Sequence, residues 1–424
     1  MKGRHILLMI GFSIFILLLS ACGDSSENAD GGENIELEFW TMQLEPTFTE
    51  YLEDLIDAYE EENPNVTIDW LDVPADDLEQ KVLSDVSADN APDVVNLNTS
   101  FGASLAELDA TTDMEEFVEE EDKDKYLEGA WEANQLDGET FGIPWYLDTD
   151  VTFNNPDIYE EAGLDVEDPP ETYKESLEYA KIIKEETGKY GYFPSLDLSL
   201  PLQYMEKMDV SLMNDDGTAA FNTKDGAEVI ELFKEFYEEE LIPKEALSGD
   251  QREGTEFYEA EEVAFGGDFF IAEVEDNAPD VYDKTIPSTA ITGDSGKLTM
   301  TVQNLVVPEQ SEHQEAAIDF ALYVTNADNQ VEFSKLSPVL PSIEDALDDP
   351  YFTEEPDDAD TADQMRIISA EQLTEAEVLV PPMENEGDLQ TVMHDAFARA
   401  MLGEQSVEDS LDQAEEEWNE IVNE

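Results

Sequence analysis

The sequence predicts an α/β fold, because segments with strand periodicity alternate with segments with helix periodicity. Residues 35–40 alternate between apolar and polar side chains, as a half-buried strand does. Apolar residues then recur every three or four positions over residues 48–59, which predicts one face of a helix that Asn63-Pro64 ends. Residues 66–70 alternate as a second strand, and residues 92–97 predict a buried third strand. An order of strand, helix, strand, helix and strand favours an α/β layer arrangement.

Later segments keep this alternation. Two capping boxes, Thr172 with Glu175 and Ser311 with Gln314, predict where two helices begin. Hydrophobic periodicity predicts a strand over residues 299–307 and helices over residues 389–401 and 407–421. The acidic, proline-interrupted stretch 348–363 is predicted to be an exposed excursion.

The first 21 residues have the features of an export signal. A basic start is followed by an apolar run that ends in Leu19-Ser20-Ala21-Cys22. This ending resembles the lipobox of bacterial lipoproteins, and the resemblance implies that residues 1–21 are removed and that Cys22 is acylated. Cys22 is the only cysteine of the chain, so it cannot form an internal disulfide. A plain secretory signal with an incidental cysteine is the alternative.

An acylated Cys22 predicts where the protein works. Several acyl chains on one residue hold a protein to a bilayer. Residues 22–34 are polar and contain glycine, so they predict a flexible tether. We therefore expect an extracytoplasmic protein that is lipid-anchored to the bacterial cell membrane.

The charge balance of the chain is extreme. It has 107 Asp and Glu residues against 19 Lys and Arg, a net charge of −88. No basic stripe is present to bind nucleic acid, and the same charge disfavours anionic ligands. Disorder is one explanation, but aromatic residues make up 9% of the chain and its helices are periodic. We interpret the acidity as that of a halophilic, folded protein, because concentrated salt screens self-repulsion.

A series of short motifs runs through the chain in a fixed order. They are Phe39-Trp40-Thr41, Asn63-Pro64-Asn65-Val66, Ala91-Pro92-Asp93-Val94-Val95, Gly142-Ile143-Pro144-Trp145, Thr152-Phe153-Asn154-Asn155, Ala162-Gly163-Leu164, Pro169-Pro170-Glu171-Thr172-Tyr173, Ala264-Phe265-Gly266-Gly267-Asp268-Phe269 and Gln303-Asn304. Together they resemble the extracellular solute-binding lipoproteins of ABC sugar importers, the family that includes maltose-binding protein. Each motif is weak alone, whereas their order behind a lipobox is specific.

The resemblance implies a two-lobed periplasmic-binding-protein-like fold of type II, whose discontinuous lobes are joined by a hinge. Lobe one would hold residues 35–152 and 289–335, and lobe two would hold residues 153–288 and 336–424. The implied function is the substrate-binding component of an ABC transporter, which captures a sugar or oligosaccharide and delivers it to a membrane permease. The expected partners are therefore a carbohydrate and permease subunits, and we expect a monomer.

A sugar site needs flat aromatic faces and a few converging hydrogen-bonding groups in a concave pocket. The chain offers such side chains where strands end near the expected cleft. The candidate ligand-binding residues are Trp40, Gln43, Asn98, Ser100, Trp145, Tyr146, Asp148, Asp268, Phe269, Phe270, Gln303 and Asn304. Each of these aromatic residues could instead pack in the core, and we interpret Trp70, Trp131 and Trp418 as packing residues.

No motif predicts catalysis, a metal site or a cofactor. The chain lacks a Gly-x-Ser-x-Gly elbow and a phosphate-binding loop, and residues 357–363 lack the pattern of a calcium loop. Only His313 and His394 follow the export signal, which disfavours a zinc site or a His-based triad. Paired carboxylates leave a surface-anchored polysaccharide hydrolase or lyase as the alternative function. A binder of another neutral solute, such as a polyol, is a third possibility.

Overall fold

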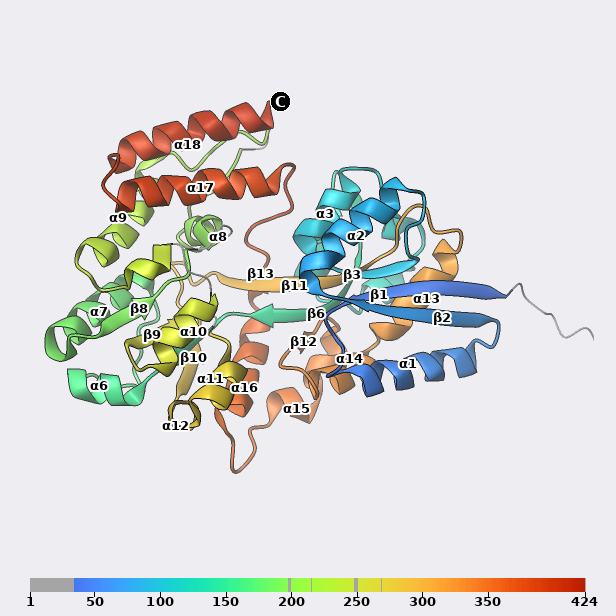
Figure 1. Cartoon of the computed structure of the whole chain (residues 1–424), viewed down its shortest axis with the longest axis horizontal. Helices are drawn as coiled ribbons and strands as arrows, with labels where there is room; N and C mark the ends of the chain where they lie inside the picture. The colour runs from blue at the N-terminus through green and yellow to red at the C-terminus, as the bar shows by residue number, and fades with distance from the viewer. Residues whose placement is uncertain (1–33, 197–199, 215, 248–250, 268, 424) are drawn as a thin grey trace, which may run out of the picture.

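The computed structural model describes residues 34–196, 200–214, 216–247, 251–267 and 269–423. In this part of the chain, two separate sheets each carry their own helices and form two bodies side by side (Figure 1). We call the body around the larger sheet lobe one and the body around the smaller sheet lobe two. Cys22 and most of the predicted tether lie outside the described residues.

Lobe one is built on a mixed sheet with the strand order β12-β6-β11-β3-β1-β2, and β13 pairs with β11 beside this path. The strands are β1 (Ile35–Met42), β2 (Val66–Val73), β3 (Val94–Asn98), β6 (Ile143–Thr149), β11 (Leu298–Val306), β12 (Leu340–Pro341) and β13 (Ala376–Glu377). β1 runs parallel to β2 and β3, whereas β11 is antiparallel to β3 and β6. β11 therefore lies inside the sheet, although it follows the strands of lobe two along the chain.

Helices cover both faces of this sheet because its inner strands are apolar on both sides. Leu37 and Phe39 join one core, and Trp40 and Val95 join a second core on the opposite face. The helical elements of lobe one are α1 (Thr49–Glu62), α2 (Ala75–Ser87), α3 (Thr99–Ala106), α4 (Glu120–Lys123), α5 (Glu128–Glu132), α13 (Gln314–Val324), α14 (Ala327–Ser334) and α15 (Pro350–Thr353), with 3-10 turns at Met114–Glu116 and Glu344–Asp348. A short hairpin joins β4 (Gln135–Leu136) to β5 (Glu139–Thr140).

Lobe two has a smaller sheet, in the order β10-β7-β9-β8, and one large core. Its strands are β7 (Val151–Asn154), β8 (Tyr190–Phe193), β9 (Val263–Gly267) and β10 (Ile286–Thr289). Its helical elements are α6 (Pro156–Ala162), α7 (Tyr173–Thr187), α8 (Leu200–Lys207), α9 (Lys224–Glu238), α10 (Gln251–Glu259), α11 (Ile271–Asn277), α12 (Pro279–Tyr282), α17 (Glu386–Met401) and α18 (Val407–Val422), with a 3-10 turn at Lys244–Leu247.

The chain passes between the sheets where β6 gives way to β7, where β10 gives way to β11, and where β13 leads to α17 (Figure 1). Helix α16 (Thr361–Leu373) contacts both cores: Leu373 is buried in lobe one, and Met365 packs against lobe two. The predicted division at residue 335 differs from this arrangement. Leu340–Pro341 pairs with β6, and Phe352 is buried in the core of lobe one, so lobe one continues well past residue 335.

Most predicted strands and helices are confirmed, including the capping box of Thr172 and Glu175 at the start of α7. The second capping box is wrong. Helix α13 begins after His313 without a side-chain cap, because Ser311 Oγ accepts from the His313 backbone N–H over 3.1 Å, one position too early, while its hydroxyl donates to Asp93 Oδ1 over 2.5 Å. The predicted excursion 348–363 is wrong in part: residues 353–358 are exposed, but α15 and the start of α16 lie within it.

Candidate functional site

A cavity of about 510 Å³ lies between the lobes. Lobe one lines it with Asn98, Thr99 and Ser100, where β3 gives way to α3, and with residues 299–303 of β11. Lobe two contributes Gln203 of α8 and Glu386 and Gln390 of α17. The segment that joins β13 to α17 adds an apolar wall of Val378, Leu379, Val380 and Pro382.

Among the described residues, the polar lining of this cavity is made of amide and hydroxyl groups and one ionisable side chain. That side chain is Glu386, which accepts a hydrogen bond from Gln390 Nε2 over 2.8 Å. Burial raises the pKa of the Glu386 carboxyl, and hydrogen bonds from Ser100 and Gln390 lower it in part. No Lys or Arg is among the lining residues, so the cavity suits an uncharged, hydroxyl-bearing ligand better than an anionic one.

Four predicted site residues reach this cavity or its wall, in different ways. Asn98 and Ser100 are half-buried, and Asn98 Oδ1 accepts a hydrogen bond from the Phe101 backbone that begins α3. Gln303 also lines the cavity, and no described residue donates to its buried Oε1. Asn304 is fully buried, and its Nδ2 donates to Thr99 Oγ1 behind the wall.

A β-bulge places Trp145 and Tyr146 together in lobe one. The register shifts between Gln303 and Asn304, so Trp145 is the extra residue of β6 opposite β11. Its ring stacks on Phe333 at 5.3 Å, and Tyr146 lies 5.5 Å from the same Phe333 ring. Trp145 is 0% exposed, which corrects its predicted role as a ligand platform. Tyr146 is half-buried, and burial raises its pKa to about 12.

Two further predicted aromatic residues also pack in cores rather than face solvent. Trp40 is 3% exposed, and the Lys81 ammonium lies 3.7 Å from the centre of its ring. Phe269 is 5% exposed and lies against Phe153 and Tyr258 in lobe two. The three packing tryptophans fit their prediction: Trp131 and Trp418 are buried, and Trp70 is half-buried.

Phe270 is the predicted aromatic residue that remains most open. It is 39% exposed and precedes α11, close to the end of β9 that pairs with β7 beside the first crossover. The Arg252 guanidinium lies 5.3 Å from the ring centre, and Arg252 Nη1 is 2.5 Å from Glu273 Oε1. The Arg252 guanidinium, held by Glu273, therefore contacts one side of the Phe270 ring, and more than a third of Phe270 stays exposed to solvent.

The first crossover carries a set of charged side chains. Asp148 is exposed near the end of β6, but the surrounding protein and then the Asp150 carboxylate raise its pKa to about 7. Asp150 forms an ion pair with Lys207 of α8, and the Lys207 side chain is only 5% exposed. Of the two remaining candidates, Gln43 is exposed just after β1, and Asp268 lies outside the described residues.

Most residues that line the cavity were not predicted as site residues. Among them are four polar side chains that flank it from α3, α8 and α17: Thr99, Gln203, Glu386 and Gln390. Thr99 lies between the predicted site residues Asn98 and Ser100, so the end of the predicted strand at residue 97 could also have identified Thr99 as a site residue. The other three lie on helices of lobe two, and no local pattern connects them to β3. Their proximity depends on how the lobes sit together.

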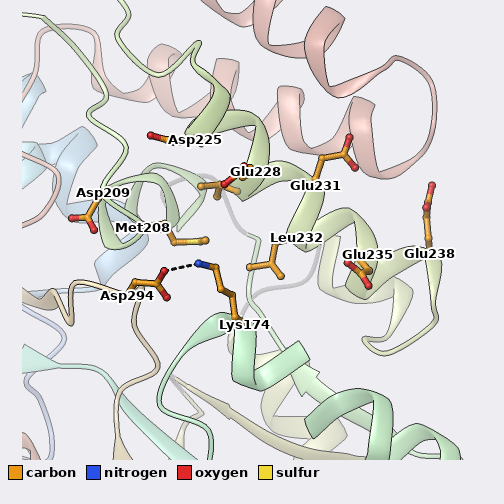
Figure 2. A pocket seen from close by; sticks show the side chains of 11 residues that line it. Lys174, Met208, Asp209, Asp225, Glu228, Glu231, Leu232, Glu235, Glu238 and Asp294 are labelled. Carbon is orange, nitrogen blue, oxygen red and sulfur yellow. Dashed lines mark hydrogen bonds and ion pairs between the residues drawn. The ribbon is translucent and has the colours of Figure 1, made fainter. Parts of the chain in front are cut away.

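A second hollow, of about 600 Å³, lies on lobe two along α9 (Figure 2). Five carboxylates of α9 line it, together with two from other segments. Those of α9 are Asp225, Glu228, Glu231, Glu235 and Glu238, and the other two are Asp209 and Asp294. Lys174 pairs with Asp294 over 2.5 Å at its edge, and both side chains are more than 60% exposed. No described cluster of His, Cys, Asp and Glu has the arrangement of a metal site.

The family model for bacterial extracellular solute-binding proteins matches residues 45–331. The chain belongs to this family. Its predicted family resemblance is thereby confirmed, and membership favours ligand binding over the polysaccharide hydrolase or lyase considered above. Among the described residues, no helix is both long and apolar enough to cross a membrane.

Relatives of this solute-binding protein span most of its length. The arabinooligosaccharide-binding protein of Halalkalibacterium halodurans is 28% identical over 360 residues, which are 80% of this chain and 77% of the relative. A crystal structure described as that of an oligosaccharide periplasmic-binding protein from Synechococcus sp. MITs9220 is 34% identical, with a TM-score of 0.83, over 91% of this chain and 99% of that chain. The sugar-binding protein MalE from Xanthomonas citri is 22% identical, with a TM-score of 0.76, over 92% of this chain and 97% of that chain. These likenesses confirm the predicted type II fold.

Proposed function

We propose that this chain is the substrate-binding component of an ABC importer and that it binds a neutral oligosaccharide between its lobes. The observation that carries the proposal is the interlobe cavity with its amide and hydroxyl lining. Its volume of about 510 Å³ falls within the usual range of ligand pockets, about 300–1,000 Å³. The wall of Val378, Leu379, Val380 and Pro382 gives the cavity an apolar surface on which the C–H face of a sugar can pack.

The names of two relatives suggest which sugar to test first. The proteins from Halalkalibacterium halodurans and Bacillus subtilis are both arabinooligosaccharide-binding proteins. We therefore propose an arabino-oligosaccharide as the first candidate ligand. Isothermal titration in molar salt with arabinotriose, maltotriose and xylotriose would measure which of these binds.

A matched pair of variants tests where the sugar binds. Gln203→Ala removes an amide from the cavity, and we expect it to weaken binding about ten- to hundredfold, the effect of losing one hydrogen bond to a ligand. Lys174→Met changes the acidic hollow of Figure 2 and should leave the affinity unchanged. Equal losses in both variants, or none in either, would place the ligand elsewhere.

We propose that the ligand is released unaltered to membrane permease subunits. Thin-layer chromatography after long incubation with the three sugars should show no shorter products. Products that the Asp148→Asn variant no longer forms would instead identify a hydrolase. Uptake of the sugar by membrane vesicles that carry permease subunits encoded beside this gene, measured with and without this protein, would test the proposed permease partner.

The membrane anchor belongs to the same proposal. Acylation of Cys22 would hold the two lobes at the outer face of the cell membrane through residues 22–34. Mass spectrometry of the amino-terminal peptide should find a diacylated or triacylated cysteine. Cys22→Ala should release the protein into the medium, and light scattering of that released protein should give a monomer.

A further inference from the structure

Behind the cavity wall, a chain of hydrogen bonds runs through buried side chains of lobe one. Asn134 Nδ2 donates to the Ala130 carbonyl over 3.4 Å and to Asn304 Oδ1 over 2.6 Å. Asn304 Nδ2 donates to Thr99 Oγ1 over 3.1 Å, and Thr99 Oγ1 donates to the Val302 carbonyl over 3.2 Å. Asn134 and Asn304 are fully buried, whereas Thr99 is half-buried and lines the cavity.

The direction of this chain is fixed at both ends by backbone carbonyls, which can only accept. If Asn134 were turned over, its amide oxygen would face the Ala130 carbonyl. If Asn304 alone were turned over, its amide nitrogen would face the amide nitrogen of Asn134. Both alternatives place like partial charges together in a buried region, where they are costly. The donors therefore follow one order from Asn134 to Thr99.

This order leaves the Thr99 hydroxyl able to accept one more hydrogen bond. A hydroxyl has one hydrogen to donate and two lone pairs to accept with. The hydrogen of Thr99 is directed to the Val302 carbonyl, and Asn304 Nδ2 occupies one lone pair. One lone pair remains, so Thr99 can offer the cavity an acceptor and no donor.

We propose that Thr99 selects ligands by accepting a hydrogen bond from a ligand hydroxyl, and that Asn304 is a positioning residue that keeps Thr99 in this accepting orientation. The inference rests on the proposed function, because it assumes that the ligand occupies the interlobe cavity. It narrows the ligand class to sugars with a free hydroxyl at the position that meets α3. An analogue that has only an acceptor at that position should be rejected.

A fluorinated series provides the probe. In each deoxyfluoro analogue of arabinotriose, fluorine replaces one hydroxyl, which keeps a similar size but removes the donor. For the wild type, one analogue should bind about ten- to hundredfold more weakly than arabinotriose. In Thr99→Val, arabinotriose itself should lose a similar factor, and that same analogue should lose nothing further. Thr67→Val, at an exposed hydroxyl of β2 outside the cavity, is the matched control and should keep the wild-type affinity and discrimination.

Asn304→Ala separates positioning from a general structural role. Without Asn304 Nδ2, only the Val302 carbonyl holds the Thr99 hydroxyl in place, so its orientation becomes less defined and the discrimination against the fluorinated analogue should shrink while Thr99 is still present. A merely structural defect would lower both affinities equally and leave their ratio unchanged. That second result would overturn the role of Asn304.

Neutron diffraction of the wild-type protein tests the orientation without any variant. A deuteron between Thr99 Oγ1 and the Val302 carbonyl is expected, and a deuteron directed into the cavity would refute the inference. Titrations then distinguish a failure of the proposed function from a failure of the role proposed for Thr99. If arabinotriose, maltotriose and xylotriose all fail to bind, the proposed function and this inference fall together. If arabinotriose or another of these sugars binds but no fluorinated position of it couples to Thr99, the inference alone is wrong.

Discussion

Replacing Lys207 with methionine is expected to destabilise the protein by about 3–5 kcal/mol, the usual cost of removing one partner of a buried ion pair. The side chains of Lys207 and Asp150 are 5% and 21% exposed, so the remaining carboxylate would lie at the first crossover with little access to water. Asp148 is close enough to interact with Asp150 and adds a like charge. Methionine has a similar length, so the packing of the side-chain stem is largely kept.

The control is Lys174→Met, which breaks the exposed pair with Asp294 at the acidic hollow of Figure 2. Both variants remove one positive charge from a chain of net charge −88, so the change in overall repulsion is matched. Because its partners are 61% and 68% exposed, the control should cost no more than about 1 kcal/mol. Urea unfolding in molar salt, followed by fluorescence and by circular dichroism, measures both. A loss in Lys207→Met no larger than in the control would refute the reasoning.

Three further outcomes are expected. Urea midpoints should rise from dilute buffer to molar salt, because salt screens the repulsion among the acidic side chains; equal midpoints would contradict the halophilic interpretation. Asp148→Asn should gain stability relative to the wild type, measured by urea unfolding, as pH rises from about 4 to about 7, because the raised pKa of Asp148 makes its ionisation costlier in the folded than in the unfolded protein. Gly191→Ala should cost at least about 3 kcal/mol in urea unfolding, since its Cβ would lie 2.3 Å from Ala180 Cα. Gly188→Ala, at φ +77° with open space around it, should cost only about 1 kcal/mol.

The strands and helices of lobe one were predictable because their signals are local. The alternation over residues 35–40 and the apolar face over residues 48–59 each describe a surface that one element buries. The aromatic site residues were not predictable in this way. Trp145 follows a strand motif that suits a cleft edge, but the bulge in β6 turns it into the core beside Phe333. Its burial depends on the register with β11, more than 150 residues later in the chain.

The start of α13 also could not be predicted from local sequence. Ser311 and Gln314 have the correct spacing for a capping box, yet the helix begins later, after His313, and the Ser311 hydroxyl instead donates to Asp93 and accepts from the His313 backbone N–H. Likewise, Phe269 and Phe270 are neighbours with the same side chain, but one is 5% and the other 39% exposed. Residue type and spacing identify candidates, whereas contacts distant in sequence decide which of them remain accessible.

The place of β11 between β6 and β3 has a consequence for synthesis. Until residues 298–306 have been made, the nascent amino-terminal half exposes two unsatisfied strand edges where its sheet is still split. Such edges invite wrong pairing, and joining them requires closure of a loop that includes all four strands of the smaller sheet. A fragment that stops before residue 298 should therefore aggregate rather than fold as a separate lobe.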